Sequence, residues 1–227
     1  MRLFRRIADW ERRQRAFYNT DLSTPENRRR ARIYNLWFDH AALRGIWSNH
    51  YPVAPGVYRS NQPTDARFLR LKAMGVRSIL NLRGATEAAH YLVEEASCRR
   101  LGLQLVSCPL QARAPAPRAD LEALIRAFRE IERPFVMHCK SGADRAGLAA
   151  AIYLLVIEGR PVRDARRMLA VKYLHFRWSH TGILDVILDH YEARQRQTGI
   201  GFEDWIATEY DPDTLQAAHA QRRKALL

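Results

Sequence analysis

The segment Phe135-Val136-Met137-His138-Cys139-Lys140-Ser141-Gly142-Ala143-Asp144-Arg145-Ala146-Gly147 decides the fold of this chain. The apolar run over 135–137 predicts a buried strand, and LAAAIYLLVI over 148–157 predicts a buried helix. The glycine-containing loop between them ends at a helix N-terminus, where backbone N–H groups and the helix dipole attract anions. The same field favours the thiolate form of Cys139. A thiolate beside a guanidinium that can grip two phosphate oxygens is suited to attack on phosphorus.

Strands and helices alternate on both sides of this segment. A Pro-Gly turn followed by a strand is predicted over 53–60, and further strands are predicted over 76–82 and 103–107. Helices are predicted over 65–74, 86–100, 121–131, 162–172 and 183–194. This alternation indicates an α/β fold with a central, largely parallel sheet flanked by helices on both faces. The loop then lies at the carboxyl end of a strand, where such sheets bind ligands.

Three stretches carry a resemblance to a known superfamily. HCKSGADR over 138–145 resembles the H-C-x5-R signature of cysteine-dependent phosphatases, which include protein tyrosine, dual-specificity and phosphoinositide phosphatases. VYRSNQP over 57–63 resembles the opening motif of bacterial dual-specificity-like enzymes, and SILNLR over 78–83 resembles their next core strand. The resemblance covers residues 50–195 and leaves the N-terminal fifth of the chain outside it.

The resemblance implies a role for each position of the signature. Cys139 would be the nucleophile that forms a cysteinyl-phosphate, and Arg145 would hold the phosphate oxygens in the transition state. His138 would be a buried hydrogen-bonding residue that orients the loop. No metal or cofactor is expected. The residues expected to bind the phosphate group around this loop are Lys140, Ser141, Gly142 and Ala143.

Two departures from the family pattern affect the expected chemistry. The family usually has serine or threonine where this chain has Ala146, so departure of the thiolate would be slow unless Ser141 substitutes in part. The family also carries an aspartate acid roughly thirty residues before the cysteine, but SCPLQARAP over 107–115 holds no carboxylate. Asp120 comes next and is typical of a helix cap or first-turn acid. Asp144 is the other candidate, because a carboxyl beside a thiolate and a phosphate tends to hold its proton. Its alternative role is an ionised group that stiffens the loop.

Three further residues have open roles. Lys140 occupies a position where phosphoinositide phosphatases of the tensin-related type also carry lysine, so it is either a second phosphate contact or a solvated side chain. Arg113 lies where the acid loop is expected and is a candidate substrate contact. Cys108 ends a strand expected beside the signature strand, which leaves both a reversible disulfide with Cys139 and a free buried thiol open.

Length and composition indicate one folded domain with appendages. The chain has 227 residues, an apolar fraction of 47% and three cysteines, which is typical of a globular protein in a reducing compartment. We expect a basic helical extension over 1–48, a phosphatase domain over 49–197 and a C-terminal helical segment over 198–227. The N-terminal residues lack the apolar stretch of a secretory signal, so the expected location is the cytoplasm.

The net charge of +13 favours polyanionic partners. Arginines are dense in the first quarter of the chain, and the spacing of its apolar residues predicts a basic amphipathic helix over 2–18. This helix either packs on the domain or lies on the inner face of an anionic membrane. Nucleic acid is a less favoured partner, because no RNA-binding motif accompanies the charge.

The sequence therefore predicts a metal-independent phosphomonoesterase of the protein tyrosine/dual-specificity type. A phospholipid or inositol-phosphate phosphatase of the same fold is the alternative substrate class. A non-catalytic phosphate-binding protein is the alternative of a different kind, favoured by Ala146 and the missing acid loop but opposed by the intact Cys139 and Arg145.

Overall fold

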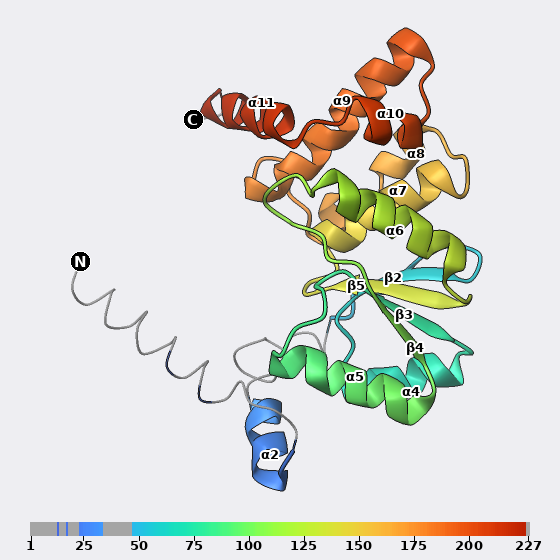
Figure 1. Ribbon diagram of the computed structural model, residues 1–227, viewed down its shortest axis with the longest axis vertical. Helices are drawn as coiled ribbons and strands as arrows, with labels where there is room; N and C mark the ends of the chain where they lie inside the picture. Colours follow the sequence, from blue (N-terminus) through green and yellow to red (C-terminus); the bar gives the residue numbers. More distant parts are fainter. Residues whose placement is uncertain (1–12, 14–16, 18–22, 34–46, 226–227) are drawn as a thin grey trace, which may run out of the picture.

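A five-stranded sheet lies at the centre of the computed structural model, which describes residues 13, 17, 23–33 and 47–225 (Figure 1). The strand order is β1-β2-β5-β3-β4, and all neighbours are parallel except the antiparallel pair of β1 and β2. The strands are β1 (Tyr51–Ala54), β2 (Val57–Asn61), β3 (Ser78–Asn81), β4 (Gln104–Ser107) and β5 (Phe135–Cys139).

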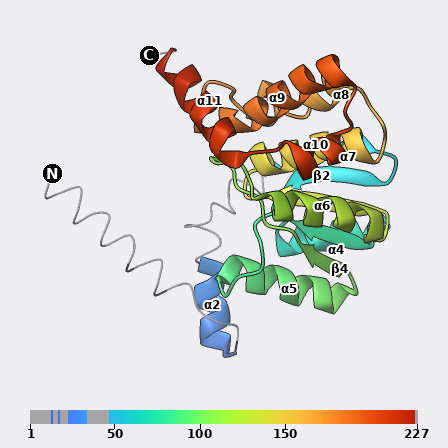
Figure 2. The ribbon, with the colours of Figure 1, turned by 45° about the horizontal axis from the view of Figure 1, so that its top comes forward.

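Helices cover both faces of the sheet, as the sequence predicts (Figures 1 and 2). Helices α4 and α5 lie on one face, while α6 to α10 form the thicker layer on the other. The helices are α2 (Pro25–Ile33), α4 (Asp65–Ala73), α5 (Ala89–Leu101), α6 (Arg118–Glu130), α7 (Asp144–Val156), α8 (Val162–Arg166), α9 (Ile183–Thr198), α10 (Phe202–Thr208) and α11 (Pro212–Lys224), with short 3-10 turns over Val171–Tyr173 and His180–Gly182.

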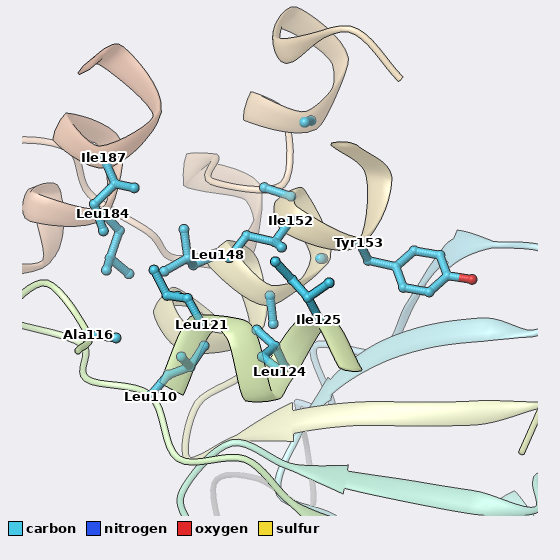
Figure 3. Close-up of a cluster of buried hydrophobic side chains, with 14 of the residues drawn as sticks. Leu110, Ala116, Leu121, Leu124, Ile125, Leu148, Ile152, Tyr153, Leu184 and Ile187 are labelled. Atoms are coloured by element: carbon cyan, nitrogen blue, oxygen red, sulfur yellow. The ribbon is translucent and has the colours of Figure 1, made fainter. Parts of the chain in front are cut away.

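Successive side chains of the central strands point to opposite faces of the sheet and pack into two separate hydrophobic cores. Ile79 and Val136 pack with α4 and α5, whereas Leu80 and Met137, their neighbours along each strand, pack with the helices of the other layer. Because both faces of the sheet are covered, the central strands are apolar throughout. The larger cluster includes Leu124, on α6 (Figure 3).

Helix α7 fills the middle of the larger core, and its small residues allow close packing. A Cβ atom at Gly147 would lie 2.8 Å from the Met168 carbonyl oxygen and from the Leu169 side chain. Only glycine fits at this approach, so α7 sits directly against the chain that follows α8.

The helix predicted over 162–172 is wrong in its second half. Helix α8 ends at Arg166, and a separate 3-10 turn follows at Val171–Tyr173. The Met168 carbonyl accepts a hydrogen bond from the buried Arg59 guanidinium at 2.5 Å. That carbonyl is thus engaged by a side chain from β2, which the periodicity of the sequence does not reveal. The other strands and helices predicted between residues 53 and 194 are confirmed to within a few residues at each end.

The N-terminal region is described only in part. Helix α2 begins at Pro25, where the Thr24 hydroxyl accepts the Asn27 N–H at 3.1 Å. The predicted helix over 2–18 lies outside the described residues except at 13 and 17, so its proposed membrane contact gains no structural description. In the described part of the chain, no helix has both the length and the apolar character needed to span a bilayer.

The C-terminal segment packs on the domain. Phe202 and Trp205 of α10 are buried in the larger core, and Leu215 of α11 joins them. Arg118 of α6 donates to the Tyr210 carbonyl at 2.8 Å, and the Tyr210 hydroxyl donates to the Ala116 carbonyl at 2.7 Å. These contacts tie α10 and the start of α11 to the segment that precedes α6.

Candidate active site

The loop that follows β5 lies at the carboxyl edge of the sheet, between β5 and the start of α7. Strand β5 is flanked by β2 and β3, and this central position leaves Cys139 only 2% exposed. Helix α7 begins at Asp144, which places an acidic residue and then Arg145 in its first turn. The strand, loop and helix predicted from the sequence are confirmed.

Four successive loop carbonyls are held from outside by donors distant in sequence. Lys140 O accepts the Gln62 N–H at 3.4 Å, and Ser141 O accepts the Asn49 side-chain amide at 3.1 Å. The carbonyls of residues 142 and 143 both accept hydrogen bonds from the same Arg59 nitrogen, Nη2, at 2.6 and 2.9 Å. In a trans peptide the C=O and the next N–H point in opposite directions. The N–H groups of residues 141–144 therefore face the inside of the loop, which is the arrangement that binds anions.

Position 142, at the apex of this loop, accepts only glycine. Its φ is +73°, a left-handed conformation that favours glycine. A Cβ atom there would also lie 2.6 Å from the Asn61 nitrogen and the Ser60 carbonyl carbon. The loop thus packs backbone against backbone on the end of β2. The Ser141 hydroxyl accepts the Ala143 N–H in a long contact of 3.4 Å within the loop.

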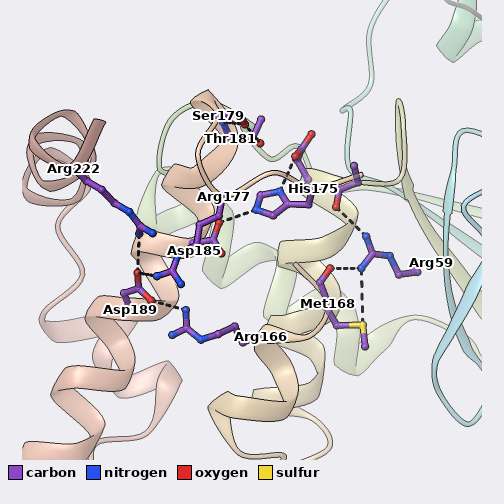
Figure 4. A network of polar contacts seen from close by, with 12 residues as sticks. Arg59, Arg166, Met168, His175, Arg177, Ser179, Thr181, Asp185, Asp189 and Arg222 are labelled. Carbon is purple, nitrogen blue, oxygen red and sulfur yellow. Dashed lines mark hydrogen bonds and ion pairs between the residues drawn. The ribbon is translucent and has the colours of Figure 1, made fainter. Parts of the chain in front are cut away.

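Arg59 is the buried residue that organises the loop from below. Its side chain is 0% exposed, stacks over the Tyr173 ring at 3.9 Å and donates to Met168 as well as to the loop (Figure 4). Burial lowers the pKa of Arg59 to about 10, although Tyr173, Cys139 and Asp144 raise it in part. Arg59 is therefore still a cation at neutral pH, placed under the loop.

The candidate acid Asp144 has an unpredicted partner. Its carboxylate accepts from His175 Nδ1 at 2.8 Å, and Nε2 of the same ring donates to Asp185 at 2.8 Å (Figure 4). Because carboxylates only accept, both ring nitrogens carry protons and the ring is an imidazolium. Burial alone would lower the pKa of His175, but the two hydrogen bonds and carboxylate charges raise it to about 9. Asp144 thus contacts a positive His175 rather than Arg145.

A second series of buried hydrogen bonds begins at His138, the residue before Cys139. His138 is 0% exposed, and its Nε2 contacts the buried Glu94 carboxylate at 2.5 Å. Glu94 also accepts the Gln62 side-chain amide at 3.0 Å, and Gln62 in turn accepts from Arg83. The hypothesis that His138 is a buried hydrogen-bonding residue is confirmed. Its partner Glu94 was not found from the sequence.

The remaining candidates are spread over the neighbouring segments. Arg145 donates toward the Leu82 carbonyl at 3.5 Å from the first turn of α7, and Lys140 is half-buried in the loop. Ala146 is fully buried. Arg113 is exposed and lines a cavity beside α11.

The structure confirms the first-turn alternative for Asp120 and corrects one prediction about a neighbouring strand. Asp120 does not cap α6: Pro117 takes the cap position, and Asp120 lies in the first turn, the other place the sequence allowed. The strand before Cys108 does not lie beside β5, because β3 lies between β4 and β5. Two strand spacings separate β4 from β5 by about 9.6 Å, beyond the ~7 Å limit for a disulfide. All three cysteines are free and buried.

Sequence reasoning missed Asn49, Arg59, His175, Asp185 and Glu94. One signal was available for two of them. Asp185 interrupts an apolar stretch of α9, and Arg59 lies in the middle of a buried strand. A charged residue at a buried position requires a partner, but the sequence does not say which one.

Known proteins resemble this chain over the same region. The family model of the DSP-PTPase phosphatase domain of Swiss Army Knife proteins, PTP-SAK, matches residues 55–181. A beta-lactamase hydrolase-like protein of Xylella fastidiosa is 36% identical over 110 residues, which cover 46% of this chain and 24% of that protein. The dual specificity protein phosphatase TpbA of Pseudomonas aeruginosa is 30% identical over 113 residues, which cover 49% of this chain and 48% of TpbA. The chain thus matches half or less of the length of these curated relatives.

Solved structures show the same fold. The crystal structure of P. aeruginosa TpbA aligns with a TM-score of 0.51 and 22% identity, over 76% of this chain and 91% of that one. A DUF442 protein of Shewanella putrefaciens aligns with a TM-score of 0.52 and 21% identity, over 64% of this chain and 90% of that one. At this level of identity the structures establish the fold alone. The family model extends over more than half of the chain, from the turn before β2 to the 3-10 turn before α9, and the chain therefore belongs to the PTP-SAK family of DSP-PTPase phosphatase domains.

Proposed function

We propose that this chain is a phosphomonoesterase of the protein tyrosine/dual-specificity type that works through a cysteinyl-phosphate on Cys139. The observation that carries the proposal is the set of four loop carbonyls held outward, which turns the N–H groups of residues 141–144 toward a bound phosphate. Cys139 begins this loop and Arg145 follows it, so a nucleophile and a guanidinium flank the same anion site.

In the first step, the Cys139 Sγ forms a bond to phosphorus while the bond from phosphorus to the leaving oxygen breaks. The loop N–H groups and Arg145 stabilise the charge that spreads over the three remaining oxygens. In the second step, a water oxygen forms a bond to phosphorus, the S–P bond breaks and the thiolate is restored. Ala146 has no hydroxyl to donate to that thiolate, so this second step is expected to limit the rate.

We propose Asp144 as the group that gives the leaving oxygen its proton. Asp144 opens α7 directly after the loop, and its contact with the imidazolium of His175 supplies a proton within the pair. His175 passes its Nδ1 proton to the Asp144 carboxylate, and Asp144 passes it on to the leaving oxygen as the P–O bond breaks. In the second step the attacking water gives up a proton to Asp144, and its return to His175 restores the imidazolium. The rival Asp120 lies in the first turn of α6.

The proposed substrates are phosphoproteins, on the strength of the similarity to TpbA, a dual specificity protein phosphatase. Phospholipids and inositol phosphates are the second candidate class, favoured by the net charge of +13 and by Lys140 at the loop. A panel of phosphotyrosine peptides, phosphothreonine peptides and inositol phosphates, compared by kcat/KM, decides between the two classes.

The experiment that tests the mechanism uses Cys139→Ser. We expect this variant to lose turnover of p-nitrophenyl phosphate while it still binds phosphate, because the backbone and the arginines hold the anion and only attack requires the thiolate. Wild-type activity should persist in EDTA and stop with vanadate. Turnover by the serine variant at the wild-type rate would refute the cysteinyl-phosphate, and turnover that depends on added divalent metal would refute the proposed enzyme class.

A further inference from the structure

A cavity of about 250 Å³ lies between three segments that the reaction does not use. Helix α11, which packs beside α9 (Figure 2), supplies one wall, and the segments before α6 and before α9 supply the others. The residues that matter for its chemistry are Arg113, His180, Gln216, His219, Arg223 and Lys224.

The lining of this cavity is cationic and includes no carboxylate among the described residues. Arg113, Arg223 and Lys224 carry permanent positive charges at neutral pH. Arg223 donates to His180 Nδ1 at 2.7 Å, which leaves the proton of a neutral His180 ring on Nε2 as a further donor. Arg222, the neighbour of Arg223 on α11, instead pairs with Asp189 of α9 at 3.1 Å. The two faces of α11 thus differ: one is neutralised by a carboxylate, and the other lines the cavity with cations.

His219 provides an independent sign that the cavity accepts a ligand. His219 is only 4% exposed, and neither ring nitrogen makes a hydrogen bond of ordinary length and angle with the described part of the chain, although the His180 backbone lies near enough to act on the ring. A buried polar group without a partner costs roughly 1–3 kcal/mol. Burial and the charges of Arg223 and Arg222 lower the pKa of His219, which the His180 backbone offsets only in part. The ring is therefore a neutral donor that an anion oxygen can satisfy.

The size of the cavity restricts what fits. Pockets that enclose drug-sized ligands measure roughly 300–1,000 Å³, whereas one water occupies about 30 Å³. A single compact anionic group fits between these limits. Histidine and lysine donors with a guanidinium suit the oxygens of a phosphate.

We propose that this cavity is a second phosphate site, which binds one phosphate group of a ligand outside the Cys139 loop. Its α11 wall lies beyond the residues 55–181 that the family model matches, whereas Arg113 and His180 lie within them. Its ligand comes either from a second phosphate of the substrate or from a separate phosphorylated effector. His180 follows His175 by five residues, so their Cα atoms lie at most about 18 Å apart, and His175 contacts Asp144 at the start of α7. One extended substrate with two phosphates can therefore approach both sites.

The first test measures binding without turnover. The full chain is saturated with vanadate to occupy the Cys139 loop and is then titrated with inorganic phosphate, while the histidine ring signals are followed by ¹H–¹⁵N NMR. We expect the His219 signal, assigned with His219→Asn, to shift with saturation. We expect Arg223→Gln/Lys224→Gln to weaken phosphate binding at least 10-fold. The matched control Arg160→Gln/Arg163→Gln removes the same charge from exposed positions near α8 and should change binding less than 2-fold.

The outcomes separate the proposal from its alternatives. Equal weakening in both double variants, or an unmoved His219 signal, would overturn the second site and leave only nonspecific charge attraction. Because this measurement requires no catalysis, it stands even if the proposed phosphatase activity fails.

A second measurement identifies the source of the phosphate. If the substrate supplies it, Arg223→Gln/Lys224→Gln raises KM for a doubly phosphorylated peptide and leaves p-nitrophenyl phosphate unchanged. If an effector supplies it, added pyrophosphate alters the wild-type rate on p-nitrophenyl phosphate and not that of the variant. Both results support the site. The site would be refuted if neither the KM for the doubly phosphorylated peptide nor the response to pyrophosphate differed between wild type and variant, and if phosphate bound both double variants equally in the NMR titration.

Discussion

Replacement of Arg59 by lysine tests whether the phosphate loop is held in shape from below. Arg59 donates to the carbonyls of residues 142 and 143 and to Met168 O, all within the buried interior. Lysine keeps the positive charge but replaces a planar fork of five donors by a single ammonium group. We expect the ammonium to reach one of the three carbonyls, so that the other two lose their hydrogen bond from residue 59.

The magnitude follows from those two lost contacts. A hydrogen bond from a charged donor contributes roughly 1.5–3 kcal/mol, so Arg59→Lys should lower the free energy of unfolding by about 3–6 kcal/mol. A domain of this kind has about 5–15 kcal/mol in total. The N–H groups of residues 143 and 144 also lose their fixed orientation. We expect vanadate to bind about 10–100-fold more weakly, which corresponds to roughly 1.4–2.8 kcal/mol.

Urea unfolding followed by circular dichroism gives the stability, and vanadate inhibition gives the affinity of the loop. Arg118→Lys is the matched control, because Arg118 also donates to two backbone carbonyls but at α10, away from the loop. Arg118→Lys should lower the free energy of unfolding without changing the affinity for vanadate. Asn49→Gly is a milder variant that removes the donor to Ser141 O while tolerating the φ of 45° at that position. Folded Arg59→Lys and Asn49→Gly proteins that bind vanadate as tightly as the wild type would refute the reasoning.

Three further predictions concern the chemistry of the site. The folded-state pKa of His175, about 9, exceeds the unfolded value of 6.5, so its contribution to stability is complete below pH 6.5 and disappears as pH rises through 9. In urea unfolding, the free energy of unfolding of the wild type should exceed that of His175→Gln by up to about 3 kcal/mol at pH 6. The two values should converge near pH 10. Rapid-quench experiments should show a burst of alcohol product, and Ala146→Ser should raise the steady-state rate; a linear time course with no gain in the variant contradicts slow hydrolysis. Asp144→Asn should slow alkyl phosphates far more than p-nitrophenyl phosphate, whereas Asp120→Asn should be silent in catalysis and cost about 0.3–1 kcal/mol of stability. Equal slowing of both substrates by Asp144→Asn would make Asp144 a structural support, and leaving-group dependence in Asp120→Asn would reassign the acid.

Local pattern was sufficient for the strand, loop and helix around Cys139. The apolar run over 135–137, the glycine at 142 and the apolar helix after Arg145 are contiguous, and each element buries its own residues. The left-handed conformation at Gly142 could likewise be predicted locally, because glycine is the residue type that favours it. The alternation of strands and helices predicted the parallel sheet for the same reason, because periodicity reports which side of each element is buried.

Long-range contacts decided the rest. Arg59 and Asn49 reach the loop across 83 and 92 residues, and His175 reaches Asp144 across 31. Periodicity gives the side on which a residue is buried, but a buried donor can satisfy any acceptor that the fold brings near it.

The order of the strands was also beyond the sequence. Placing β4 beside β5 and placing β3 between them satisfy the same apolar pattern, so only the assembled sheet excludes the bond between Cys108 and Cys139. Helix α8 ends early for a similar reason, since the Met168 carbonyl bonds to a side chain from β2. The sequence by itself determined the elements and the reactive loop, because those depend on neighbouring residues. Only the tertiary structure determined which buried charges support the loop, because those charges come from segments that meet after the chain has folded.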